Sequence, residues 1–324
     1  MDDPLRIITE AQGVFLRREA LEWGYTDKAI RSRLRAGEWH RVRHGAYCFR
    51  DQWAPLFAED RHLLLAKAVL RTTPGPVALS HTTALIAHGV AVWGADLRRV
   101  HVTRLDEGAG RIERDVRHHV GKMRKGEEIA RVDSMPVVGV ARAVIEAASI
   151  LKTESALVSA DSSLFHELCT PDDLRAVFDA FNHWPGSQKI HVVLNRADGR
   201  HESPGETRSD HLFWRFGLPQ PVPQWEIRDH NGTLVARLDF AWPELGVWGE
   251  FDGKGKYVKF LKEGQTIEDA VIEEKNRENL VRQLTGWMCG RIVYDDFHTP
   301  ALTAQRFRQL FKLAADARAA WHSA

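Results

Sequence analysis

Three carboxylates lie close together in one apolar segment of the sequence. Asp239, Glu250 and Asp252 belong to LDFAWPELGVWGEFDGKGKY, which spans residues 238–257. A carboxylate is costly to bury unless a positive charge lies beside it. The segment has the pattern of two strands joined by a turn, and Glu250 and Asp252, two residues apart on one strand, share a face. We therefore predict a metal site that holds Mg²⁺ or Mn²⁺, because hard cations bind carboxylate oxygens and water.

The flanking segments predict the elements that position these acids. ETRSDHLFWRFG, residues 206–217, has helical apolar spacing, and QPVPQWEIRD, residues 220–229, has the pattern of a strand. Asn231-Gly232 is a strong hairpin signal that joins this strand to the next. A long helix and a final strand follow within residues 266–296. The predicted order is αβββαβ.

This order, together with its acids, resembles the core of the PD-(D/E)xK nucleases. The text RLDFAWPELGVWGEFDGKGKY is similar to a segment of the branch related to very-short-patch repair endonucleases, and the resemblance covers residues 203–297. It implies that Asp239 and Glu250 are catalytic metal ligands. It also implies that Glu206 on the leading helix completes the metal site, with Asp252 as a supplementary acid.

The lysine of the nuclease motif has no counterpart at its usual position, where this sequence has Asp252. Lys254, Lys256 and Lys275 are the candidates for an assisting base, and we favour Lys275, in EEKNREN, over Lys256. The resemblance implies that the metal lowers the pKa of a bound water, which attacks phosphorus. A lysine beside that water orients it or neutralises charge. Predicted phosphate contacts are Arg208, Arg237 and Arg277.

Each of these residues also has a purely structural interpretation. Ser203-Pro204-Gly205-Glu206 is a capping box, with serine at the cap, proline at the first helical position and glutamate at the third. Asp252-Gly253 has the composition of a turn at a strand end. The loop lysines are equally compatible with solvated charge.

A basic region lies near the N-terminus. Residues 5–35 contain three segments with helical apolar spacing, Thr26 or Asp27 is placed to cap the third, and Gly37 to end it. WHRVRHGAYCF then alternates around Gly45, as in a hairpin. Three helices and a hairpin are the plan of a winged helix. The predicted nucleic-acid contacts are Arg31, Arg33, Arg35, Arg41 and Arg43. The alternative is a solvated charged helix.

This region also resembles a known family. GVFLRREALEWGYTDKAIRSRLRAGEWHRVRHGAYCF is similar to the N-terminal winged helix of AbiEi-type antitoxins, with the "RxxxGxY" pattern at Arg41 to Tyr47. The following ALSHTTALIAHGVAVWG and RRVHVTR are similar to the next segment of those proteins, so the resemblance covers residues 5–105. It implies a winged helix that binds promoter DNA and represses its own operon.

The remaining sequence favours an ordinary soluble enzyme or regulator. The chain has 324 residues, a formal net charge of +1 and three widely spaced cysteines, so we expect neither a disulfide frame nor a zinc-cysteine site. No leader peptide or membrane span is recognisable, so we expect a cytoplasmic protein. Among the histidines, His118 and His119 are adjacent and point apart on a strand, and Ser80-His81 is interpreted as a cap and a packing residue.

We predict a multidomain α/β protein. Residues 1–50 form a winged helix, residues 51–200 a mostly helical middle region and residues 201–324 a nuclease-like domain. In the middle region we expect short strands at VALS and RRVHVTR and helices at residues 140–148, 154–164, 171–180 and 187–197, and ADGRHESPG, residues 197–205, is the predicted linker. The predicted function is that of a Mg²⁺- or Mn²⁺-dependent DNA endonuclease or nickase in defence or repair. The alternative is an AbiEi-like regulator, with DNA and a cognate toxin as partners, whose nuclease fold is not catalytic. RNA remains open as a substrate, and the oligomeric state is not predicted.

Overall fold

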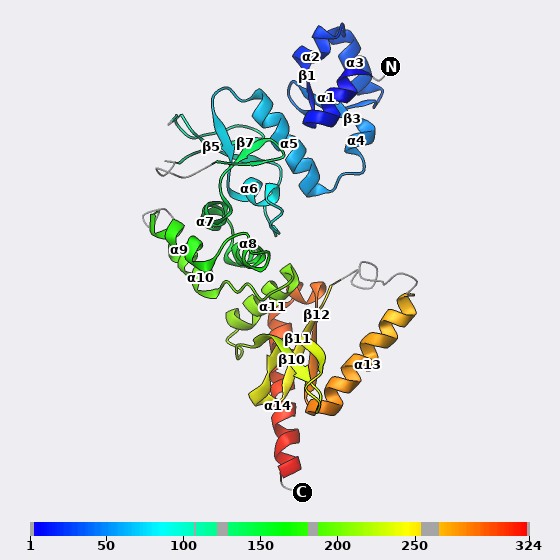
Figure 1. Ribbon diagram of the computed structural model, residues 1–324, viewed down its shortest axis with the longest axis vertical. Helices are drawn as coiled ribbons and strands as arrows, with labels where there is room; N and C mark the ends of the chain where they lie inside the picture. Colours follow the sequence, from blue (N-terminus) through cyan, green and yellow to red (C-terminus); the bar gives the residue numbers. More distant parts are fainter. Residues whose placement is uncertain (1–2, 107, 122–128, 181–186, 254–265, 323–324) are drawn as a thin grey trace. The chain divides into compact units, whose positions relative to one another are not determined.

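The computed structural model describes residues 3–106, 108–121, 129–180, 187–253 and 266–322 (Figure 1). The chain divides into two compact units, residues 1–197 and residues 198–324. Both units combine helices with sheets, which confirms the predicted α/β class. The boundary falls within the predicted polar linker ADGRHESPG. No helix within the described residues is long and apolar enough to cross a membrane.

The N-terminal part of the first unit has three helices and a small antiparallel sheet, in the order β1-β3-β2. Its elements are α1 (Pro4–Gln12), β1 (Phe15–Leu16), α2 (Arg17–Glu22), α3 (Asp27–Arg35), β2 (Trp39–Arg43) and β3 (Ala46–Phe49). Phe15, Ile30 and Trp39 are among the buried residues of its core. The Thr26 hydroxyl accepts a hydrogen bond from Ala29 N at 3.2 Å and so caps α3, as one of the two predicted alternatives.

The rest of the first unit contains more strands than the sequence predicted. Its elements are α4 (Arg50–Trp53), α5 (Ala58–Thr72), β4 (Val77–Leu79), α6 (His81–Ala87), β5 (Val100–Arg104), β6 (Arg111–Ile112), β7 (Val116–Val120), β8 (Ala130–Val132), β9 (Met135–Val137), α7 (Val140–Ile150), α8 (Thr153–Phe165), α9 (Pro171–Ala180) and α10 (Ser187–Arg196). Six strands form one mixed sheet, in the order β6-β7-β5-β4-β9-β8.

The predicted mostly helical middle region is therefore wrong in one respect, because it missed four of these strands. They are two to five residues long and carry little apolar alternation. The β8–β9 hairpin turns at Asp133 and Ser134, both with positive φ (46° and 65°). A two-residue hairpin turn is usually predicted from Asn-Gly or Asp-Gly, and this sequence has Asp-Ser at the turn.

The second unit has the predicted αβββαβ order followed by one more helix. Its elements are α11 (Pro204–Arg215), β10 (Val222–Arg228), β11 (Leu234–Trp242), the short 3₁₀ turn η1 (Pro243–Leu245), β12 (Val247–Asp252), α13 (Ile267–Thr285), β13 (Met288–Val293), the 3₁₀ turn η2 (Tyr294–His298) and α14 (Pro300–His322). The sheet order is β10-β11-β12-β13, and β12 and β13 are parallel, with α13 as the crossover (Figure 1).

The side chains of strand β11 pack into one core before Asp239 and into another core after it. Before this residue, Leu238 packs with Trp248 and with Val281 of α13. After it, Phe240 packs with Phe213 of α11 in a second cluster, which also includes residues of α14. Leu238 and Phe240 would share a face in a regular strand. Leu238 and Phe240 instead belong to two different cores, and Asp239 lies between them on the strand.

Candidate functional site

The acids predicted from the sequence lie near one another in the second unit. Asp239 Oδ2 accepts a hydrogen bond from the backbone N–H of Phe251 at 2.8 Å, which ties β11 to β12 beside Glu250. The negative charge of Asp239 contributes to a raised pKa at both Glu206 and Glu250. Glu206, Asp239 and Glu250 therefore interact electrostatically as one group, although they come from α11, β11 and β12.

Glu206 is buried at the start of α11 and has several hydrogen-bond partners. Its Oε1 accepts from the Ser203 hydroxyl at 2.7 Å, and its Oε2 accepts from Glu202 N at 3.0 Å and from Gln224 Nε2 at 2.8 Å. Ser203 Oγ in turn accepts from Glu206 N at 3.3 Å. Ser203 thus caps α11 as predicted, whereas the Glu206 carboxylate binds Glu202 N and the Ser203 hydroxyl and not Ser203 N, the donor that a capping box uses. Burial, and then the charge of Asp239, raise the pKa of Glu206 to about 7.

Glu250 is 1% exposed, and an arginine accompanies it. Its Oε1 accepts a hydrogen bond from Arg277 Nη2, and the same nitrogen donates to Glu274 Oε1 at 2.7 Å. Its Oε2 is buried with no hydrogen-bond partner among the described residues. Burial raises the pKa of Glu250 to about 7, Arg277 opposes this rise, and Glu274 and Asp239 add to it.

Asp252 is paired with an arginine that the sequence analysis did not single out. Its Oδ2 accepts from Arg291 Nη1 at 2.8 Å, and Arg291 Nη2 donates to Glu278 at 2.6 Å. Arg291 lies directly opposite Glu250 in the parallel β12–β13 pair. The only sequence signal for this partner was an arginine on the neighbouring predicted strand.

Arginines therefore supply counter-charge where a cation was predicted. Arg277 pairs with Glu250, Arg237 pairs with Glu202, and the Arg208 guanidinium lies 3.8 Å from the Phe297 ring centroid. All three had been predicted to contact phosphate. Lys275 is exposed on α13, whereas Arg277 on the same helix reaches Glu250. Lys254 and Lys256 lie outside the described residues.

Two observations bear on the metal prediction, which stays a prediction. Glu250 Oε2, buried and with no hydrogen-bond partner among the described residues, and the nearby charge of Asp239 would suit a hard cation. However, no three of the described acids bring their ligand atoms to within 4.8 Å of one another. A shared ion would require these side chains to move together. The described residues that do meet this distance are three histidines, His81, His101 and His119.

Four of the five arginines predicted to contact nucleic acid are exposed: Arg31, Arg33 and Arg35 on α3, and Arg41 on β2. Arg33 also pairs with Glu38, and both side chains of this pair are about half exposed. Arg43 is half-buried, and its guanidinium donates to Thr72 Oγ1 at 2.8 Å and lies 3.1 Å from Asp115. Arg43 is therefore held within the fold, whereas the exposed Arg33 stays accessible and its surface pair contributes little to stability.

Comparisons with known proteins bear on the N-terminal part. The family model described as "Transcriptional regulator, AbiEi antitoxin" matches residues 5–50, which confirms the resemblance of that part. A search of curated proteins found no match. The chain is similar to the crystal structure of the RV2827C protein from Mycobacterium tuberculosis, at 14% identity and a TM-score of 0.39, over 69% of this chain and 87% of that chain. The nuclease resemblance of residues 203–297 stays a prediction.

Proposed function

We propose that this protein is a DNA-binding transcriptional regulator that reads DNA with α3 of its N-terminal winged helix. The observation that carries the proposal is the exposed arginine face of α3 within the segment that matches the AbiEi regulator family. As an antitoxin-like regulator, the protein would also bind a cognate toxin, and this partner is part of the same proposal.

The geometry of α3 supports insertion into a major groove. Ile30 is 3% exposed and anchors the helix to the core formed with Phe15 and Trp39. Arg31 and Arg35 are four residues apart, so they share one face of the helix. A recognition helix places such side chains against bases and phosphates. Arg41, exposed on β2, is positioned on the wing and would contact a flanking phosphate.

The test compares binding of the full chain to the DNA upstream of its own gene and to unrelated DNA of equal length, by fluorescence anisotropy. We expect tighter binding to the upstream fragment, and a loss of binding to both in Arg31→Ala/Arg35→Ala. The control is Arg98→Ala, which removes an exposed arginine paired with Asp96 at 2.8 Å outside the winged helix. Equal binding by the double variant and the wild type would reject the proposal.

A second candidate function is metal-dependent cleavage of DNA by the second unit. It is favoured by one specific observation: Glu250 Oε2 is buried with no hydrogen-bond partner among the residues that the structure describes, and Asp239 and Glu274 lie close enough to raise its pKa. In this proposal Asp239 and Glu250 hold Mg²⁺ or Mn²⁺, with Glu206 and Asp252 as supplementary acids. A bound ion of this kind supplies a water of lowered pKa and a polarised phosphate oxygen. Arg277 would release Glu250 and turn to the phosphate, and Lys275 or Lys256 would assist.

Plasmid DNA incubated with the protein and Mg²⁺ or Mn²⁺ tests this second function. We expect nicked or linear product with the wild type and none with Asp239→Asn/Glu250→Gln, whose side chains keep their size but lose their charge. Arg98→Ala serves as the active control. The absence of cleavage by the wild type in both metals, with DNA binding intact, would leave the regulator as the function.

A further inference from the structure

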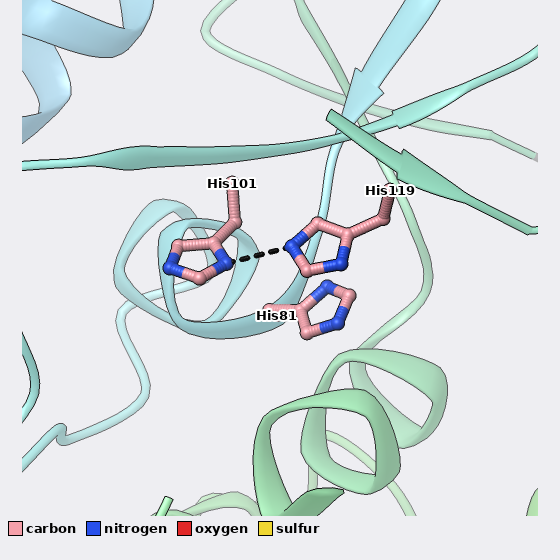
Figure 2. Close-up of side chains that lie close together, drawn as sticks. All are labelled: His81, His101 and His119. Carbon is pink, nitrogen blue, oxygen red and sulfur yellow. Dashed lines mark hydrogen bonds between the residues drawn. The ribbon is translucent and has the colours of Figure 1, made fainter. Parts of the chain in front are cut away.

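Three histidines from three separate elements converge in the first unit. His81 begins α6, His101 lies on β5 and His119 lies on β7 (Figure 2). One ring nitrogen of each lies within 4.8 Å of the other two. His101 Nδ1 and His119 Nε2 share a hydrogen bond of 2.8 Å, and the His81 ring stacks on His119 with centroids 3.6 Å apart (Figure 2).

The sheet register explains why these side chains meet. Strands β5 and β7 are parallel, and His119 is paired with Thr103, two residues after His101. The two histidines are therefore diagonal neighbours on one face of the sheet. His118 points to the opposite face, where its Nε2 lies 3.3 Å from Glu113. The prediction that the side chains of His118 and His119 point apart is thus correct. It did not reveal that His119 meets histidines of other elements.

His81 is held in place by an unusual backbone. Its φ is +51°, a region that costs energy for a residue with a side chain. Ser80 does not cap α6 with its side chain, contrary to the sequence interpretation. Its hydroxyl instead lies 3.0 Å from His81 Nδ1. The Glu146 carboxylate lies 3.4 Å from the same nitrogen. Both contacts involve Nδ1 while the ring is stacked on His119.

The protonation state of the cluster suits coordination. Burial, followed by the mutual repulsion of neighbouring imidazoles and arginines, lowers the pKa of His119 to about 3 and holds the pKa of His81 well below its usual range. Burial and the charge of Arg117 lower the pKa of His101 to about 4. All three rings are neutral at pH 7. Neutral imidazole is the form that binds a metal.

The charges around the cluster partly offset one another. Arg117 and Arg142 lie close enough to lower the pKa of His81, and their charge opposes a cation. Arg142 Nε, however, donates to Glu146 at 2.7 Å, so this pair carries no net charge. A carboxylate next to a ligating imidazole is the usual outer partner that orients the ring. Arg117 and Arg99 also oppose a cation at His101, and the charge of Asp96 favours one.

We propose that His81, His101 and His119 form a binding site for one transition-metal ion of the zinc class. Imidazole nitrogens suit zinc, nickel, copper and iron, and three of them leave a fourth position for water or a ligand. Binding breaks the His101–His119 hydrogen bond, and the proton of that bond moves to the other nitrogen of the ring that carried it. His81 rotates out of the stack so that its free nitrogen faces the ion.

The test measures Zn²⁺ binding to the full-length chain by equilibrium dialysis after treatment with a chelator, in excess Mg²⁺ to occupy carboxylate sites. The wild type is expected to retain one Zn²⁺ per chain. His119→Gln should bind more than about 100-fold more weakly, since the loss of an outer partner alone costs about 10–100-fold. Glu146→Gln should weaken Zn²⁺ binding by about 10–100-fold, the effect of losing an outer partner.

His118→Gln is the matched control, because it changes the adjacent histidine on the opposite face of the same strand and should keep Zn²⁺ binding. X-ray absorption of the zinc-loaded wild type adds a measurement that needs no variant, and it should show imidazole ligands at about 2.0–2.1 Å. Failure of the wild type to retain Zn²⁺, retention by His119→Gln equal to that of the wild type, or absorption without imidazole ligands would overturn the proposal.

Discussion

The buried acids of the second unit are stabilised by paired arginines and by protonation. Glu250 has Arg277 on one oxygen and, within the described part of the chain, no hydrogen-bond partner on the other, and its pKa is raised to about 7. Glu206 has a pKa raised to about 7 although Glu202, Ser203 and Gln224 donate hydrogen bonds to its carboxylate. Near neutral pH these carboxyls are therefore partly protonated. Because burial makes the charged form of these carboxyls unfavourable, the free energy of unfolding of this unit depends on pH.

We predict that this unit loses stability as the pH rises from about 4.5 to about 7. A carboxyl whose folded pKa is above its unfolded value binds more protons when folded in this window, so the free energy of unfolding falls with pH. The fall is on the order of 1–3 kcal/mol for each group. Urea unfolding at pH 5 and pH 7.5 measures it. Glu250→Gln should show a smaller fall, and an unchanged fall would contradict the raised pKa.

The ion pair between Arg277 and Glu250 predicts a large effect of removing one partner. Arg277→Met leaves a buried carboxylate without its cation, which typically costs about 3–5 kcal/mol. The double variant Arg277→Met/Glu250→Gln removes the charge and should recover part of this loss at pH 7.5. Thermal unfolding compares the two variants. A single variant as stable as the wild type would show that the pair contributes nothing.

At the residue scale, the sequence predicted the acids but not their partners. Asp239, Glu250 and Asp252 were recognisable because each is a charge in an apolar strand. Arg291 and the three histidines were not, because their meaning depends on which strands are neighbours. Spacing along the chain does not contain that information when the residues come from three separate elements.

At the element scale, the start of α11 must pack directly against β12 to bring Glu206 to the acids. Gly205 makes this possible, because a β-carbon there would lie 2.0 Å from the Phe251 ring. Gly290 has a similar role against Phe307, at 2.8 Å, where α14 crosses β13. These glycines lie where two elements approach closely, and nothing in the local sequence distinguishes them from turn glycines.

We predict that Gly205→Ala destabilises the second unit by about 1–3 kcal/mol, the usual cost of overpacking. Gly253→Ala is the matched control, because its β-carbon would lie 3.6 Å from the same Phe251 ring, an ordinary contact. Urea unfolding followed by tryptophan fluorescence compares the two. Equal stability of both variants would contradict the prediction, because it would show that α11 can move away from the Phe251 ring with no loss in the free energy of unfolding.

Long elements were predicted well and short ones poorly. The α7 to α10 helices and the αβββαβ order have strong apolar periodicity or clear turn residues. The strands of the six-stranded sheet are too short to show periodicity, and β7 is mostly polar with VRHHV. Their pairing with distant strands overrides their weak local preference. The histidine cluster depends on this pairing, which explains why it was missed.

At the scale of the whole molecule, the proposed DNA-reading helix belongs to the first compact unit and the acids belong to the second. We predict that Asp239→Asn/Glu250→Gln leaves the affinity of the full chain for its upstream DNA unchanged when no divalent metal is present. Fluorescence anisotropy in EDTA measures this. A marked gain in affinity would indicate that the acids face the DNA and repel its phosphates.

The central claim is that the exposed arginine face of α3 binds DNA, and the salt dependence of binding tests it most directly. Each phosphate neutralised adds about 0.9 to the slope of log affinity against log salt concentration. The slope of Arg31→Ala/Arg35→Ala should therefore be smaller than that of the wild type by about 2, whereas Arg98→Ala should keep the slope. A double variant with the slope and affinity of the wild type would contradict the account.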